Sequence, residues 1–426
     1  MTAQVSAVGT TYSSKSVRSI VVASIGNILE WFDFTVYGFV AVIMAKHFFP
    51  ASNEYTSLLL SFATFGVGFV ARPIGAVVFG RMGDVKGRKF VLLLSMFLMA
   101  SASFLIGIAP TVASIGMWAS VLIVFARVVQ GFSAGGEFGN AAAFLIEWAP
   151  EGRRGFYGSF HQVGTSGGLL VGSVLVAILS TQLSPADFEN WGWRIPFLLG
   201  GALALIGMYM RRNVDETPFF LKKSESGTEQ AEKIIKPLLK CIGIVTLWTV
   251  SVFVTLVYMP TFTQKFGHLS PSDALWATTI ALIVNVLTMP FAGYLSDRFG
   301  RRSLILIAAV AFALLTVPFF QIIVTGTTFS GIALILTLFG FFSALIAASG
   351  PATISELFTT KRRSTWVSIG SAIAVLIFGG FAPFIATLLI EKTGSPISPA
   401  YYVVACAILT GITALTLRET AKLPLR

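Results

Sequence analysis

The chain has 426 residues, of which 55% are hydrophobic and 12% are charged. About a quarter of the residues of an ordinary water-soluble protein are charged, so this composition excludes a soluble globular chain and predicts a protein that lies mostly in lipid. The net charge of +11 is spread over many short segments, which indicates membrane topology and no nucleic-acid partner.

Apolar stretches with few or no charged residues mark the predicted membrane crossings, because an exposed charge at the bilayer centre costs about 3 kcal/mol or more. Twelve such stretches follow one another, so we expect an all-α polytopic membrane protein of twelve transmembrane helices in two six-helix halves. The predicted spans are residues 19–45, 56–80, 90–108, 114–148, 155–181, 194–211, 241–264, 273–294, 303–323, 330–357, 365–391 and 399–418.

The basic residues are distributed unequally between the two sides of the membrane. With the N-terminus in the cytoplasm, 24 of the 30 Lys and Arg residues fall on that side, four fall on the other side, and Arg72 and Arg127 lie inside spans. This asymmetry predicts that both termini are cytoplasmic. The predicted parts are a tail (1–18), a first half (19–211), a linker (212–240), a second half (241–418) and a second tail (419–426).

A short sequence frame occurs once in each half. Gly80, Asp84, Gly87 and Arg88 have the same spacing as Gly293, Asp297, Gly300 and Arg301, at an offset of 213 residues, half of the chain length. A second pair of motifs agrees, because Glu147 with Arg153 is followed 209 residues later by Glu356 with Arg362. We expect a repeated fold, in which the loop carboxylates pair with arginines as a latch at the cytoplasmic end. Charges that serve only topology are the alternative.

The repeated Gly-x3-Asp-x2-Gly-Arg frame resembles the major facilitator superfamily of secondary transporters. Several further segments are similar to its metabolite:proton symporter branch, whose members carry citrate, tricarballylate, 2-oxoglutarate, shikimate or proline and betaine. These segments begin at Gly26 (GNILEWFDF), Arg72 (RPIG), Arg127 (RVVQGFSAGGEFG), Trp191 (WGWRIPF) and Ile377 (IFGG). The resemblance implies two six-helix halves that rock about a central substrate site.

A carboxyl group near the middle of the first span, Asp33, is the main candidate for proton coupling. Glu30 and Tyr37 lie one turn to either side of it on much the same face. A buried carboxyl is neutral or paired, so one whose cationic partner approaches and withdraws can take up and release a proton. A static ion pair that only fixes helix packing is the alternative from burial alone. The resemblance implies that Asp33 faces an arginine on span 4.

Arg127 occupies that position on span 4, and Gln130 and Glu137 share its helical face. Our hypothesis is an Asp33–Arg127 pair that opens on protonation. The polar residues of the spans that we consider as substrate-binding candidates are Tyr37, Arg72, Gln130, His161, Gln162, Tyr258, Asn285 and Ser371. The alternatives are a packing or gating role for Arg72, a core role for His161, and bonding of Ser371 to its own helix.

These features favour a proton-coupled symporter of a small organic acid anion, such as a di- or tricarboxylate, that works by alternating access. A zwitterionic osmolyte such as proline or betaine is the second candidate substrate, and a membrane sensor that transports nothing is the third candidate function. Three scattered histidines and no paired metal-ligand motif argue against an enzyme and against a metal or catalytic site. We expect no cofactor besides the proton, and a monomer surrounded by lipid in a bacterial inner membrane.

Overall fold

The structure is a computed structural model of the 426-residue chain. It describes residues 14–86, 88–135, 145–146, 149–212, 234–359 and 363–423, but not the side chains of residues 14–26, 83–86, 88–89, 92 and 204–212. The predicted residues that lie outside the described residues are Gly87, Glu137, Glu147 and Arg362, together with the side chains of Asp84 and Arg88.

The described secondary structure is helical, which confirms the predicted all-α class. The first half of the chain forms α1 (Ser14–Phe39), α2 (Ala41–Phe48), α3 (Glu54–Lys86), α4 (Arg88–Ile108), α5 (Val112–Ile115), α6 (Trp118–Ala134), α8 (Arg154–Gln182), α9 (Pro185–Asp187), the π-helix η1 (Phe188–Gly192) and α10 (Arg194–Arg212). The second half forms α12 (Ile235–Val252), η2 (Phe253–Tyr258), α13 (Met259–Phe266), α14 (Pro271–Phe299), α15 (Arg301–Thr325), α16 (Phe329–Ser355), α17 (Arg363–Ala374), η3 (Val375–Gly380), α18 (Ala382–Thr393) and α19 (Ser398–Leu415).

Among the described residues, eight helices are long and apolar enough to cross a membrane. One bent pair and three shorter apolar helices, Leu93–Ile108, Trp118–Ala134 and Arg194–Leu203, lie where the remaining crossings are expected. The described helices therefore occur at all twelve predicted positions.

Two predicted spans differ from the structure. The first span does not continue straight to residue 45, because the helix bends by 65° between α1 and α2 at Val40, whose backbone leaves the helical region (φ −105°, ψ 19°). The fourth span begins with a separate turn, α5, because Gly116 adopts a left-handed conformation (φ +61°) before α6. The described part of α6 ends at Ala134.

Two spans of the second half are interrupted by π-helical turns that the sequence does not signal. η2 joins α12 to α13, and η3 joins α17 to α18. Both turns contact helices of the first half, η2 with α1 and η3 with α3. π-helical turns are rare and often occur at functional sites, so these turns direct attention to the surface between the halves.

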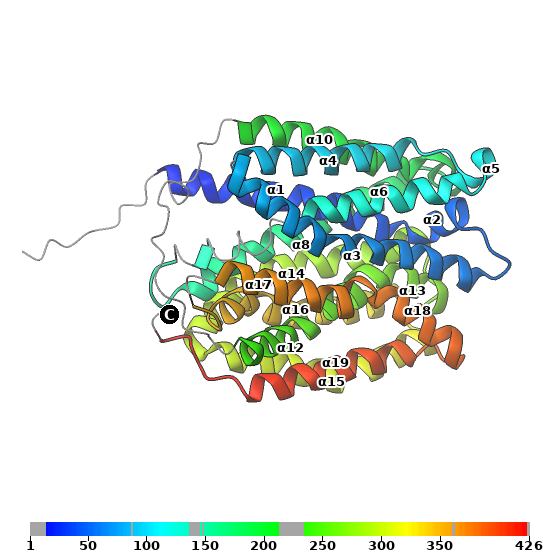
Figure 1. Ribbon diagram of the computed structural model, residues 1–426. Coiled ribbons are helices and arrows are strands. Elements are labelled where there is room, and N and C mark those ends of the chain that lie inside the picture. The colour runs from blue at the N-terminus through cyan, green and yellow to red at the C-terminus, as the bar shows by residue number, and fades with distance from the viewer. Residues whose placement is uncertain are drawn as a thin grey trace, which may run out of the picture.

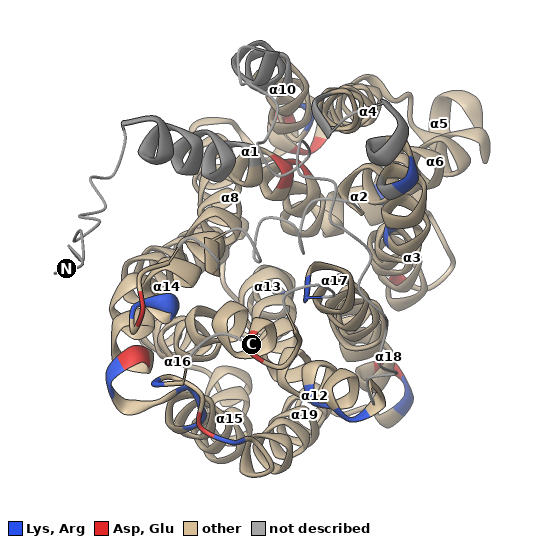
Figure 2. Ribbon diagram, turned by 60° about the vertical axis from the view of Figure 1, so that its left-hand side comes forward, with Lys and Arg blue, Asp and Glu red and all other residues tan. Residues whose placement is uncertain are grey.

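Figures 1 and 2 show the helices of each half gathered into one group, with the two groups side by side along their length. α8 packs along α14 more extensively than any other pair of described helices, and α3 packs against α18 and η3. We call the end where α14 meets α15 the basic end, and the end where α13 meets α14 the opposite end. The basic end is the one predicted to be cytoplasmic.

Candidate functional site between the two halves

Asp33 of α1 lies deep in the first half, with 1% of its surface exposed. It faces Gly200 of α10, where a Cβ atom would lie 1.8 Å from the Asp33 Oδ1 atom, so only glycine leaves room for this carboxyl group. Asp33 Oδ1 is buried and has no hydrogen-bond partner among the described residues.

Arg127 of α6 is completely buried, and its guanidinium donates to three acceptors. It bonds the backbone carbonyls of Phe34 and Phe65 over 3.1 and 3.4 Å, and the side-chain oxygen of Gln130 over 2.7 Å. The described contacts include no ion pair between Arg127 and Asp33, so the predicted direct pair is not formed in this conformation. The pair is absent because the Arg127 guanidinium already donates to these three uncharged oxygens.

Gln130 connects Arg127 of α6 to Ser103 of α4. Its amide nitrogen donates to the Ser103 hydroxyl over 2.8 Å, while its amide oxygen accepts from Arg127. A continuous line of hydrogen bonds therefore runs from Arg127 through Gln130 to Ser103.

Five aromatic rings gather beside the buried Arg127 and the half-buried Arg72, and we call them the aromatic wall. They are Trp31, Phe34, Phe65, Phe69 and Phe253. Phe253 comes from η2 in the second half, and its ring centroid lies 5.2 Å from that of Phe69 and 5.8 Å from that of Phe65. All five side chains are at least nine-tenths buried. The wall therefore joins the two halves at the depth of Asp33.

Arg72 of α3 lies against this wall. Its guanidinium carbon is 5.0 Å from the Trp31 ring centroid, 4.6 Å from that of Phe34 and 4.7 Å from that of Phe69, distances at which cation–π attraction operates. Its Nε and Nη2 atoms are buried and have no hydrogen-bond partner among the described residues. The Glu30 carboxylate acts on Arg72 electrostatically.

Two other substrate-binding candidates are aromatic. Tyr37 lies beside the buried arginine, with its ring centroid 4.9 Å from the Arg127 guanidinium carbon, and its hydroxyl donates to the Ser61 carbonyl over 3.2 Å. Tyr258 is buried toward the opposite end, where its ring packs edge-on against Phe62.

The remaining candidates lie on helices away from the aromatic wall. Asn285 of α14 donates to the Gly340 carbonyl of α16 and so connects two helices of the second half. The Ser371 hydroxyl of α17 is buried and has no hydrogen-bond partner among the described residues. His161 and Gln162 are buried on α8, where the His161 carbonyl accepts from Asn27. The described contacts do not bring these four residues to Arg72.

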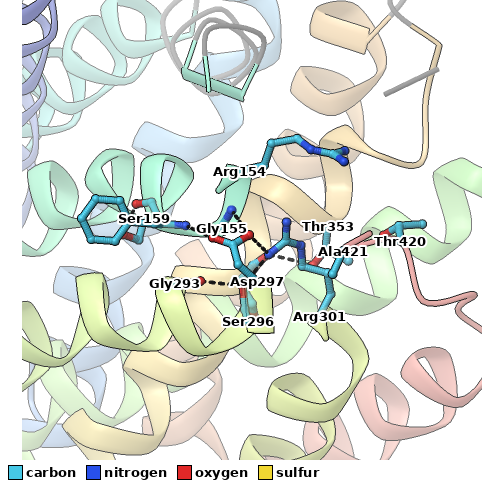
Figure 3. Close-up of polar contacts among 12 residues, drawn as sticks. Arg154, Gly155, Ser159, Gly293, Ser296, Asp297, Arg301, Thr353, Thr420 and Ala421 are labelled. Carbon is cyan, nitrogen blue, oxygen red and sulfur yellow. Dashed lines mark hydrogen bonds and ion pairs between the residues drawn. The ribbon is translucent and has the colours of Figure 1, made fainter. Parts of the chain in front are cut away.

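The repeated frame of the second half forms a charged cluster at the basic end (Figure 3). The Asp297 carboxylate accepts the backbone N–H groups of Gly155 and Phe156, both over 2.8 Å, and pairs with Arg301 over 2.7 Å. Gly293 comes so close to α8 that a Cβ atom would lie 2.6 Å from the Gly155 carbonyl oxygen. The frame therefore joins α14 to the first turn of α8, across the two halves.

Glu356 extends the cluster to the end of α16 and to the C-terminal segment. It pairs with Arg154 over 2.9 Å and with Arg301 over 3.4 Å, and it accepts the Thr420 hydroxyl. The predicted latch residue Arg153 is exposed, and its neighbour Arg154 makes the contact instead, because only Arg154 lies on the buried side of the first turn of α8. Arg154 also donates to the Leu423 carbonyl of the C-terminal segment.

The opposite end is also joined across the halves. Lys265 of α13 pairs with Glu54 of α3 over 3.0 Å, and the Trp276 indole of α14 donates to Thr181 of α8 over 3.1 Å. Arg72, Arg127 and Asp33 thus lie between contacts that join the halves at both ends of the bundle.

Sequence reasoning missed Ser103, Gly200, Phe253 and Arg154 as parts of these sites. The serine, the glycine and the phenylalanine lie in apolar spans, where such residues are common and carry no signal of their own. Arg154 was visible as the second basic residue of its pair, but the sequence did not indicate which of the two points inward.

The comparisons with known proteins agree with this architecture. Residues 19–240 match the family described as sugar (and other) transporter, and residues 241–425 match the Major Facilitator Superfamily. The chain is 36% identical over 428 residues to a proline/betaine transporter of Escherichia coli strain K12, which covers 96% of this chain and 85% of the relative. The chain is also 36% identical to a glycine betaine/proline/ectoine/pipecolic acid transporter of Dickeya dadantii, over 96% of this chain and 84% of the relative.

Solved structures have the same fold. A crystal structure of a D-xylose–proton symporter has a TM-score of 0.76 at 19% identity, over 94% of this chain and 97% of that chain. A partially occluded inward-open xylose transporter of Escherichia coli has a TM-score of 0.74 at 21% identity, over 96% and 99% of the two chains. The chain belongs to the major facilitator superfamily of membrane transporters.

Proposed function

We propose that this chain is a proton-coupled symporter of a small zwitterionic osmolyte, such as glycine betaine or proline. The names of its relatives support this substrate class, and they replace our expectation of a di- or tricarboxylate. The protein would lie in a bacterial inner membrane with both termini in the cytoplasm, as the distribution of basic residues indicates.

The observation that carries the proposal is the position of Arg72 against the aromatic wall. Nε and Nη2 form one edge of the guanidinium, and this edge has no hydrogen-bond partner among the described residues. Two parallel N–H donors fit one carboxylate. Aromatic faces attract a substituted ammonium group, as in known sites for quaternary amines. A substrate whose carboxylate binds Arg72 and whose ammonium group contacts the neighbouring rings has the chemistry of a betaine or an imino acid.

The same geometry disfavours citrate or 2-oxoglutarate. A second or third carboxylate would need a second guanidinium, but the Nη1 and Nη2 atoms of Arg127 already donate to Phe34, Phe65 and Gln130. Of the Arg127 donor atoms, only Nε lacks a partner among the described residues. One available cationic edge beside several rings suits a molecule with one carboxylate and one positive group.

Asp33 would carry the coupling proton. It is the buried carboxyl group next to this site, and it lies between the contacts that close the two ends. In alternating access, rocking of the halves opens one end at a time. Moving a proton inward with a neutral substrate gains about 2.3 kcal/mol per 100 mV of membrane potential.

Uptake into proteoliposomes tests the proposal. With an inward proton gradient, labelled glycine betaine or proline should accumulate and unlabelled betaine should compete, while citrate and 2-oxoglutarate should not. Arg72→Lys keeps the charge but loses the two-donor edge, so KM should rise about tenfold, since a hydrogen bond to a charged group contributes about 1.5–3 kcal/mol. Arg81→Lys, on an exposed part of the same helix, is the control.

Three results would decide against the proposal. Accumulation of citrate but not of betaine would mean that the protein transports organic acid anions. Binding of betaine without accumulation would mean that the protein is a membrane sensor. An equal KM in the two lysine variants would remove Arg72 from the substrate site.

A further inference from the structure

We propose that Glu54 and Tyr55, at the start of α3, form an entry site for the ammonium group of the substrate, and that the Lys265 side chain occupies this site while the opposite end is closed. The proposal rests on the proposed function, because it needs a substrate with a substituted ammonium group. It adds a second site, at the start of the helix that carries Arg72, where an arriving molecule is bound first.

Lys265 of α13 lies against two groups of the first half at once. Its Nζ atom is 3.0 Å from the Glu54 Oε1 atom and 4.5 Å from the centroid of the Tyr55 ring, and 16% of the lysine side chain is exposed. A carboxylate beside an aromatic face attracts an ammonium group, whether that group belongs to a lysine or to a ligand. Lys265 is thus a tethered cation in a site that suits other cations.

The first half holds this site in place by its own hydrogen bonds. The Asn53 side-chain oxygen accepts the Tyr55 N–H over 2.9 Å, and the Ser57 N–H donates to the Asn53 carbonyl. The Ser57 hydroxyl in turn accepts the N–H of Ala51 over 3.0 Å. None of these bonds involves the second half. Separation of the halves at the opposite end would therefore remove Lys265 together with α13 and leave the carboxylate and the ring in position for a ligand.

The same face of α3 leads from the entry site to the aromatic wall. Tyr55, Phe62 and Phe69 follow one another at intervals of seven residues, so each lies within about 20° of the one before it around the helix axis, and the rise from the first to the last is about 21 Å. Rings of η2 pack edge-on against both Phe62 and Phe69. Opening of this end would uncover a line of aromatic faces that ends beside Arg72.

Lys265 is held weakly enough to be exchanged for a ligand. The Glu54 side chain is 72% exposed, and exposed ion pairs contribute little to stability. An entry site must bind and release its ligand quickly, which weak binding allows. The predicted topology places this end outside the cytoplasm, so a molecule that is taken up into the cell arrives here first.

Breaking the contact from each of its two sides separates an entry site from a contact that only closes the end. Initial rates of uptake of labelled glycine betaine into proteoliposomes, at low concentration, give kcat/KM. Tyr55→Leu removes the ring and should lower kcat/KM about threefold, the size of one cation–π contact at an exposed site. Lys265→Gln breaks the same contact but leaves the site, so kcat/KM should stay equal or rise. Glu189→Gln removes a carboxylate from the other ion pair at this end and should have no effect.

Tetramethylammonium, an ammonium ion without a carboxylate, tests the site without transport. In saturation-transfer NMR of the purified full-length protein, Lys265→Gln should give a stronger signal from this probe than the wild-type protein, because the tethered amine no longer competes. Addition of Tyr55→Leu to that variant should return the signal to the wild-type level. The neutral molecule tert-butanol, which has a similar shape, should show no such difference among the three proteins.

Equal values of kcat/KM in Tyr55→Leu and Lys265→Gln would overturn the proposal, because they would mean that the contact only closes the end. An equal tetramethylammonium signal in Lys265→Gln and in the double variant would overturn it as well. Failure of the proposed function would appear instead as absent uptake of glycine betaine by the wild-type protein. The NMR comparison does not require that uptake, so the two failures are distinguishable.

Discussion

The Asp297 carboxylate of α14 accepts the backbone N–H of Gly155, the second residue of α8, over 2.8 Å. The first N–H groups of a helix have no partner within the helix and carry partial positive charge. A carboxylate from one half thus binds the start of a helix from the other half. Opening of the basic end must break this contact, because it crosses the surface along which the halves separate.

Asp297→Asn should shift the protein toward the conformation that is open at the basic end. An amide oxygen replaces a charged acceptor of two N–H groups, and the pair with Arg301 is lost. Hydrogen bonds to charged groups contribute about 1.5–3 kcal/mol, so the open population should rise about tenfold or more. A cysteine at the buried position Ser159 should then react faster with a water-soluble maleimide, in a background where Cys241 and Cys406 are replaced.

The control for this prediction is Asp187→Asn. Asp187 bonds Ser184 within the first half, at the opposite end, so its loss should not change the reactivity at position 159. Equal labelling rates for Asp297→Asn and the unsubstituted protein would contradict the role of Asp297 as a latch.

Glu54→Gln should have a smaller effect at the opposite end. The Glu54 side chain is 72% exposed, and exposed ion pairs contribute less than about 1 kcal/mol. The population open at this end should therefore change less than about fivefold, and high salt should abolish the difference. A cysteine at the buried position Thr261 reports the opening. Glu189→Gln breaks the Lys46 pair within the first half and should have no effect, whereas a tenfold change in Glu54→Gln would mean that the pair is stronger than its exposure indicates.

Phe253→Leu should weaken substrate binding. The change keeps an apolar side chain at the junction of the halves but removes the ring faces next to Phe65 and Phe69. Cation–π attraction in a dry site is worth about 2 kcal/mol, so the KM for glycine betaine should rise about tenfold. Phe312→Leu removes a ring that stacks on Phe339 inside the second half. The same rise in KM for both variants would show that the effect is general packing.

Asp33→Asn should separate substrate movement from proton coupling. The amide is nearly the same size as the carboxyl and fits against Gly200, but it binds no coupling proton. Uphill uptake driven by a pH gradient should disappear, while exchange of internal unlabelled for external labelled substrate should continue. Asp273→Asn, which alters the side-chain acceptor of the Ser270 hydroxyl in a helix cap at the opposite end, serves as the control. Undiminished accumulation by Asp33→Asn would rule out this residue as the coupling group.

The sequence predicts the charged parts of both sites better than their neutral parts. The sequence identifies Asp33, Arg127 and Asp297 as candidates because a charge in or beside an apolar span costs free energy and therefore indicates a functional role. Gly293 and Gly300 are visible because their frame is repeated. Ser103 and Phe253 are not visible, because the face that a span turns to its neighbours depends on packing that only the folded structure determines. Arg153 and Arg154 differ by about 100° around the helix, so an uncertainty of one residue exchanges the inner for the outer position.

The C-terminal segment after α19 should leave the basic end when the pH falls. The Glu419 carboxylate accepts the backbone N–H groups of Arg301 and Arg302 at the start of α15, and those of Thr420 and Ala421 in its own segment. Partial burial alone would raise the pKa of Glu419, but these four donors outweigh it and hold the pKa below its ordinary value. A carboxyl with a lowered pKa stabilises the bound segment at neutral pH, and this stabilisation is lost as the pH falls through the pKa of the bound state.

Spin labels at the exposed positions Ser303 and Lys422 measure this contact. At neutral pH the distance distribution between the labels should be narrow, and it should broaden on acidification. Glu419→Gln should give the broad distribution already at neutral pH, because a neutral amide cannot accept all four N–H groups. Arg418→Gln changes the neighbouring exposed charge, which has no part in these four bonds, and should keep the narrow distribution. A distribution that stays narrow in Glu419→Gln at every pH would mean that the contacts of Thr420 and Leu423 with Glu356 and Arg154 hold the segment without Glu419.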